Sequence, residues 1–135
     1  MFAKSWTAKT TIDTLPYAQC ASWNPNLLCL ADTRKSLIDE IIKWIYSADE
    51  SKGAEIFWLC DLAGAGKSAI AHTVAQYCDN HGLLGSSFFF DRNIPDRRSP
   101  QKLFSTIARD LLKLDNNLPD DIRLILENDR SVATA

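Results

Sequence analysis

The sequence predicts an α/β fold in which two parallel strands are joined by a crossover helix and flanked by further helices. Short apolar runs at residues 55–60 and 86–90 have the length and aromatic content of buried strands. Between them, apolar side chains over residues 67–79 recur on one helical face. Strand, helix and strand in this order indicate a parallel pair with a right-handed crossover.

The overall composition is typical of a globular protein. The chain has 135 residues, of which 46% are apolar and 24% charged, and its net charge is -2. This balance argues against a dedicated nucleic-acid-binding protein. No apolar run reaches the roughly 18 residues needed to cross a bilayer, and the first residues lack the apolar segment of a secretory signal. We therefore expect a cytoplasmic protein that binds neither nucleic acid nor membrane.

The cysteines are too far apart to predict a metal site. Cys20, Cys29, Cys60 and Cys78 are separated by nine residues or more, and the two histidines do not complete a zinc spacing. We expect reduced, buried thiols and no catalytic cysteine.

Three segments divide the chain. Residues 1–31 show no sustained periodicity and predict an extended lead-in, residues 32–130 form the domain, and residues 131–135 are a tail. Within the domain, Asp32 or Thr33 is the expected N-cap of a helix that ends near Ser47. Further helices are expected to begin at residues 99–100, where a serine precedes a proline, and near Pro119.

One motif indicates chemistry. Asp61-Leu-Ala-Gly-Ala-Gly-Lys-Ser68 nearly matches the phosphate-binding pattern G-x-x-x-x-G-K-[ST], and it lies between a predicted strand and a predicted helix. Such a loop directs backbone N–H groups at phosphate oxygens, its lysine reaches the β- and γ-phosphates, and its hydroxyl binds Mg²⁺. Ser68 is the expected metal ligand. The predicted nucleotide-binding residues are Asp61, Leu62, Ala63, Gly64, Ala65, Gly66, Lys67, Ser68 and Ala69.

Asp61 departs from the pattern because it replaces the first glycine. A carboxylate about 6 Å from a phosphate, at an effective dielectric of about 20, would be repelled by roughly 2–3 kcal/mol before screening. This cost largely disappears where the side chain points away from the nucleotide.

Other polar and aromatic residues have simpler interpretations. We interpret His72 as a residue of the helix surface rather than a catalytic base. Arg92, Arg97 and Arg98 are expected in a solvated loop, although they also have the charge to contact a phosphate or a partner. The three phenylalanines at 88–90 are expected in the core of a sheet.

Several motifs together resemble a known family. Trp-Leu-x-x-x-Ala-Gly-x-Gly-Lys-Ser-Ala-Ile-Ala at 58–71 is similar to the NACHT-type nucleotide-binding domains of fungal STAND proteins, and more narrowly to the nephrocystin-like N-terminal domain. Cys-Leu-Ala-Asp-Thr-Arg at 29–34, Leu-Gly-Ser-Ser-Phe-Phe-Phe-Asp-Arg at 84–92 and Leu-Phe-Ser-Thr-Ile-Ala at 103–108 resemble further motifs of that family, in the same order.

The resemblance implies a partial P-loop NTPase with an incomplete sheet. Asp32 and Asp61 stand where the family usually has glycine, and no apolar strand ending in acidic residues, the Walker B motif, follows residue 115. We therefore expect the first part of a larger NTPase domain, which does not hydrolyse nucleotide by itself, is marginally stable and tends to self-associate.

The resemblance also implies a function. It predicts binding of ATP or GTP with Mg²⁺, as part of a STAND-type signalling switch that has protein partners or self-assembles in the full-length protein. A second hypothesis is a degenerate interaction module that binds no nucleotide. A third is a small P-loop kinase, which the sequence favours less because it has no visible lid or phosphoacceptor site.

Overall fold

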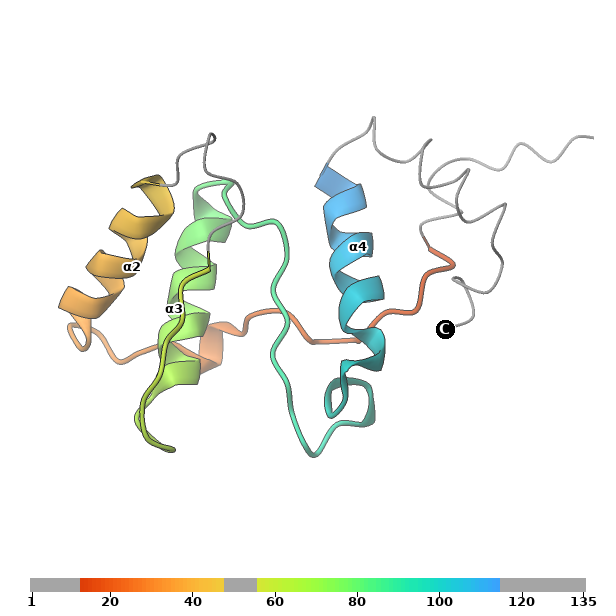
Figure 1. The fold of residues 1–135 in the computed structure, drawn as a ribbon, viewed down its shortest axis with the longest axis horizontal. Coiled ribbons are helices and arrows are strands. Elements are labelled where there is room, and N and C mark those ends of the chain that lie inside the picture. Colours follow the sequence, from red (N-terminus) through yellow and green to blue (C-terminus); the bar gives the residue numbers. More distant parts are fainter. Residues whose placement is uncertain (1–12, 48–55, 115–135) are drawn as a thin grey trace, which may run out of the picture. The chain divides into compact units, whose positions relative to one another are not determined.

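In the computed structural model, residues 13–47 and 56–114 are described, and they belong to two compact units. One unit runs from Trp23 to Leu84; the other combines the described residues up to Ser22 with those from Gly85 onward. The helices of the described residues appear in Figure 1. They are η1 (Pro25–Leu27), α2 (Lys35–Ser47), α3 (Lys67–Asn80), η3 (Pro95–Arg97), η4 (Pro100–Lys102) and α4 (Leu103–Leu114).

In the first unit, α2 packs against α3 (Figure 1). The buried side chains of α3 include Ile70, Ala75 and Cys78, which recur on one face of the helix. The helix ends at Asn80, and Gly82, whose φ of 67° suits glycine, lies just beyond it. Gly82 and Leu83 donate their N–H groups to the carbonyls of Asp79 and Cys78. The helix predicted over 67–79 is therefore confirmed.

Helix α2 begins later than predicted. Its first residue is Lys35, and the N–H of Ile38 donates to the carbonyl of Arg34. Thr33 does not cap the helix, because its hydroxyl donates to the carbonyl of Leu30 at 2.6 Å. Asp32 forms an ion pair with Lys35. The predicted N-cap is wrong because both side chains have other partners.

The predicted α/β fold is wrong for the described residues, which contain helices and no strand. Residues 55–60 and 86–90 are predicted to pair as buried parallel strands, and of these the structure describes residues 56–60 and 86–90. Instead Ile56 and Trp58 are 85% and 81% exposed, and Phe90 is 58% exposed. Phe89 donates its N–H to the carbonyl of Ala21, a contact that does not extend into a ladder. Apolar runs form strands only beside a partner strand, and no such partner lies within the described residues.

The second unit is built around α4. Leu15 packs with Leu112 and Ala108 in its core, and the N–H of Ala18 donates to the Thr106 hydroxyl at 3.0 Å. The helix start predicted at residues 99–100 is confirmed, with the short turn η4 preceding α4. The early segment of the chain is thus fixed to α4 through apolar packing and a buried hydrogen bond.

Tyr17 connects the same segment to α4. Its ring lies 5.0 Å from the Arg109 guanidinium and 5.2 Å from the Lys113 ammonium, and its hydroxyl donates to Asp110 at 3.1 Å. Ser86 donates to the other oxygen of the Asp110 carboxylate. Burial and the neighbouring carboxylate raise the pKa of Tyr17 above its ordinary value of 10.0.

The raised pKa of Tyr17 predicts a loss of stability in alkali. Above pH 10.0, the unfolded chain loses the tyrosine proton before the folded chain does, so the free energy of unfolding should fall as the pH rises. Tyr17→Phe should show a shallower decline between pH 10 and 11.5 when both proteins are unfolded in urea. Equal slopes for the two proteins would contradict this assignment.

The cysteines were predicted to be reduced and buried, and the prediction of burial is wrong for some of them. All four cysteines are free, but only Cys78 is buried, and burial raises the pKa of its thiol. Cys20 and Cys60 are exposed. Cys60 stands at the end of the run that was predicted to be a buried strand, and that strand does not form.

Some predictions lie outside the described residues: the helix from Pro119, the tail at 131–135, and the first part of the lead-in. In the part of the chain that the structure describes, no helix has the length and apolar character needed to cross a bilayer. The same residues contain no cluster of three or more His, Cys, Asp or Glu side chains that could hold a metal ion.

Candidate functional site

Residues 61–66, called here the glycine loop, lead directly into α3. Gly64 and Gly66 adopt φ values of 82° and 84°, a left-handed conformation that costs other L-residues about 1–2 kcal/mol each. A Cβ at either glycine would meet no atom within 4 Å, so the backbone conformation, not the available space, requires glycine. The turn is closed by the N–H of Ala65, which donates to the carbonyl of Leu62 at 3.2 Å.

The N-terminus of α3 has no side-chain cap. Gly66 occupies the N-cap position and has no side chain to accept from the N–H groups of the first turn. These N–H groups and the helix dipole place partial positive charge at the end of the glycine loop. An uncapped helix N-terminus behind left-handed glycines has the chemistry of an anion site.

Lys67 folds back over the glycine loop. Its ammonium donates to the carbonyl oxygens of Asp61 and Leu62, both at 2.7 Å. The cation therefore lies at the loop itself, and it would have to exchange these carbonyls for phosphate oxygens when an anion binds.

The Asp61 carboxylate is turned toward its own backbone. One of its oxygens accepts the N–H of Leu62 at 2.7 Å, and the side chain is exposed. Asp61 thus occupies an N–H group of the loop that a phosphate could otherwise approach. Asp61 would therefore oppose phosphate binding in two ways: its carboxylate competes with a phosphate for the Leu62 N–H, and its charge repels the phosphate, as expected from the sequence.

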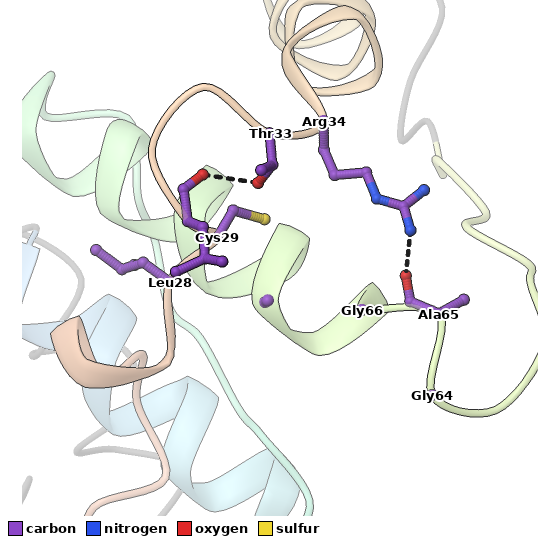
Figure 2. A pocket seen from close by; sticks show the side chains of 9 residues that line it. Leu28, Cys29, Thr33, Arg34, Gly64, Ala65 and Gly66 are labelled. Atoms are coloured by element: carbon purple, nitrogen blue, oxygen red, sulfur yellow. Dashed lines mark hydrogen bonds between the residues drawn. The ribbon is translucent and has the colours of Figure 1, made fainter.

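A second segment, residues 28–34, lies across from the glycine loop. Figure 2 shows Arg34 reaching toward the loop, where its guanidinium donates to the carbonyl of Ala65 at 2.9 Å. Arg34 itself has a φ of 57°. Between the two segments lies an open pocket of about 290 Å³. It is lined by Leu28, Cys29, Leu30, Thr33, Arg34, Gly64, Ala65, Gly66 and Ala69.

Hydrogen bonds hold this second segment against α3. The N–H of Cys29 donates to the Thr73 hydroxyl at 2.9 Å, and that hydroxyl donates to the carbonyl of Ala69 at 2.8 Å. Earlier in the chain, the N–H of Asn24 donates to Nδ1 of His72, the neighbour of Thr73, at 3.1 Å. His72 is buried, so its assignment to the helix surface is wrong. His72 is therefore a structural residue: it holds the segment around Asn24, which precedes the pocket lining, against α3.

The remaining predicted candidates lie in the other unit. Arg97 is mostly buried; it donates to the carbonyl of Cys20 at 2.8 Å and pairs with Asp91. Arg92 and Arg98 are exposed, as expected for a solvated loop. The interpretation of residues 88–90 as sheet core is wrong, because the rings of Phe88 and Phe90 pack edge to face outside any sheet.

In the structure, part of the predicted segment 61–69 forms one wall of the pocket. The opposite wall was not predicted from the sequence to belong to a site. Arg34 and residues 28–30 supply this wall. The available signal was the similarity of residues 29–34 to a family motif, which indicates relatedness but gives no role to the residues.

Comparison with known proteins gives one finding. The sequence model of the family described as Nephrocystin 3, N-terminal, matches residues 32–135. The match covers both walls of the pocket except for residues 28–30. No curated protein and no solved structure matches the chain.

Proposed function

This chain belongs to the nephrocystin 3 N-terminal family, and we propose that its residues 61–69 bind ATP or GTP together with Mg²⁺. The observation that carries the proposal is the pair of left-handed glycines, Gly64 and Gly66, directly before the uncapped N-terminus of α3. This combination supports an anion site built from backbone N–H groups. The partly exposed Lys67 places its ammonium, which is bonded to the carbonyls of Asp61 and Leu62, beside this site.

Each side chain has a distinct role in the proposed complex. Lys67 releases the loop carbonyls and contacts the β- and γ-phosphates as a point charge. The exposed Ser68 hydroxyl, in the first turn of α3, binds Mg²⁺, which keeps most of its waters. No residue of the chain is assigned a catalytic role.

The wider role follows from the resemblance to NACHT-type domains of STAND proteins. We infer that the loop belongs to a nucleotide-controlled signalling switch in the cytoplasm. Protein partners or self-assembly of the full-length protein would read the nucleotide state. The four free thiols support a reducing compartment.

Calorimetric titration tests the proposal directly. The chain is titrated with ATP and with GTP, each with and without Mg²⁺. We expect at least one nucleotide to bind, and Mg²⁺ to strengthen that binding. Ser68→Ala should remove the Mg²⁺-dependent gain while keeping the metal-free affinity. Absence of binding by both nucleotides would refute the proposal.

The second candidate function is an interaction module that binds no nucleotide. The observation that favours it is the exposure of three large apolar side chains close together in sequence, Ile56, Trp58 and Leu62, each more than 80% exposed. An apolar surface of this kind is more typical of contact with another protein than of a solvated loop. The titration described above separates the two functions.

Removal of the Asp61 carboxylate should tighten nucleotide binding or leave it unchanged. Asp61→Gly restores the usual loop residue and frees the Leu62 N–H, while Asp61→Asn removes the charge but keeps an acceptor for that N–H. We expect the glycine variant to bind at least as tightly as the asparagine variant, and both at least as tightly as wild type, by calorimetry. A clear loss of affinity in both would mean that the carboxylate has a positive role, for example toward Mg²⁺.

A further inference from the structure

Ser99 is followed by a proline, and no other serine or threonine of the chain is. The sequence holds five prolines, and the residue before each of the other four is leucine, asparagine or isoleucine. Ser99-Pro100-Gln101-Lys102 is therefore a single Ser-Pro-x-Lys segment, in which proline follows the hydroxyl residue and a lysine stands three positions after it. This is the pattern on which proline-directed serine/threonine kinases act.

A proline after the hydroxyl residue has a physical meaning for a kinase. Proline has no backbone N–H. A substrate groove without an acceptor at this position therefore binds proline at no cost, whereas it leaves the N–H of any other residue unpaired. The lysine adds a cation that an acidic group of the kinase can pair. The two features can be removed separately by substitution.

The structure leaves this segment at the surface of its unit. Ser99 is partly exposed, and Arg98, Pro100 and Gln101 are exposed. Ser99 precedes η4 with an extended backbone, at a φ of -136° and a ψ of 159°, and its hydroxyl makes no cap hydrogen bond to that turn. The hydroxyl is therefore not used to begin the helical segment, and it can react without breaking a cap.

Only short turns surround Ser99, so the segment can open locally at little cost. Both η3 and η4 are single turns of three residues. Lys102 pairs with Asp96 at 2.6 Å, but their side chains are 36% and 38% exposed, and exposed pairs of this kind add little to stability. Segments with few buried contacts are the ones that open most readily in a folded protein.

The structure also distinguishes between two kinds of kinase. Arg97 and Arg98 precede Ser99, so the alternative is a kinase that recognises arginine before the hydroxyl residue. The Arg97 side chain is only 13% exposed; it pairs with Asp91 and donates to a backbone carbonyl at 2.8 Å. It would have to leave both partners to enter a kinase, whereas Pro100 is already exposed.

We propose that Ser99 is a phosphorylation site for a proline-directed serine/threonine kinase. The kinase transfers the γ-phosphoryl group of ATP. A bond forms between Oγ of Ser99 and phosphorus, the bond from that phosphorus to the departing ADP oxygen breaks, and the hydroxyl proton passes to a carboxylate of the kinase. The product carries a charge of about -1.5 to -2 at Ser99. The site lies outside the glycine loop, so the inference does not depend on nucleotide binding.

The test incubates the full chain with a purified cyclin-dependent kinase and Mg-ATP. Mass spectrometry measures the uptake of phosphate and locates it in the sequence. We expect one phosphate per chain, at Ser99, and none in Ser99→Ala. Pro100→Ala should lower the initial rate about tenfold or more, and Lys102→Ala about two- to fivefold. Circular dichroism melts establish that the variants are folded.

Ser36 offers a matched control. It is an exposed serine of α2 that follows Arg34 and Lys35, but leucine and not proline comes after it. Ser36→Ala should therefore take up phosphate at the wild-type rate.

Three results would overturn the proposal. The first is a wild-type chain that takes up no phosphate. The second is a Ser99→Ala variant that takes up as much phosphate as wild type. The third is a folded Pro100→Ala variant that reacts at Ser99 at the wild-type rate, because the proline would then not direct the reaction.

Discussion

Lys67→Ala should lower nucleotide affinity about 10- to 100-fold, because it removes a charge-assisted contact to the β- and γ-phosphates worth about 1.5–3 kcal/mol. The measurement is calorimetric titration of the two proteins with the same nucleotide and Mg²⁺. The change should leave the fold nearly unaltered, since the two bonds that the ammonium makes to the carbonyls of Asp61 and Leu62 lie on an exposed loop.

A charge-matched control makes this experiment specific. Lys43 is an exposed lysine of α2 and lies outside the glycine loop and the pocket lining. Lys43→Ala removes the same positive charge from the same unit, so it should retain the wild-type affinity. Equal affinities of wild type and Lys67→Ala would remove the proposed phosphate site. An equal loss of nucleotide affinity in both variants would mean that the loss comes from the change in net charge and not from a contact made by Lys67.

The helices were predictable because their signals are local. The apolar spacing over residues 67–79 predicted α3 almost to its last residue, Asn80. Serine and proline at 99–100 marked the approach to α4 in the same way. Helical hydrogen bonds join residues four apart, so a short stretch of sequence contains both partners.

The strands failed for the opposite reason. The apolar run at 56–60 is compatible with a strand, but a strand is completed by hydrogen bonds to a second segment. In the structure one side of the run packs inward, with the ring of Phe57 against Trp44 at 5.3 Å, while Ile56 and Trp58 on the other side remain exposed. The composition of the run shows how apolar it is, but it does not show which segment of the chain lies beside it.

The candidate site was predictable in its loop and unpredictable in its surroundings. Residues 61–69 are contiguous, so their spacing alone predicted a phosphate-binding turn. Arg34, 31 residues before its partner Ala65, enters through the packing of residues 28–34 on α3. His72 shows the same limit: its partner, the N–H of Asn24, is 48 residues away, and burial follows from that contact.

Residues 13–31, which precede the domain predicted from the sequence, also depend on partners that are distant in the sequence. Leu15, Ala18 and Ala21 are buried although residues 1–31 show no periodicity. Ala18 is fully buried, so its N–H cannot reach water, and the Thr106 hydroxyl, 1% exposed, accepts it. A buried donor with one side-chain acceptor makes this position sensitive to a small chemical change.

Thr106→Val should destabilise the unit that contains α4 by about 1–3 kcal/mol, because it keeps the shape of the side chain but leaves the Ala18 N–H without its acceptor. Thr106→Ser keeps the acceptor and loses one methyl group, so its cost should be only about 1 kcal/mol. Two measurements check the order of the variants: urea unfolding followed by circular dichroism, and hydrogen exchange at the Ala18 amide. That amide should exchange faster in the valine variant than in the serine variant. A valine variant as stable as wild type, with the same protection at Ala18, would show that the early segment does not depend on this bond.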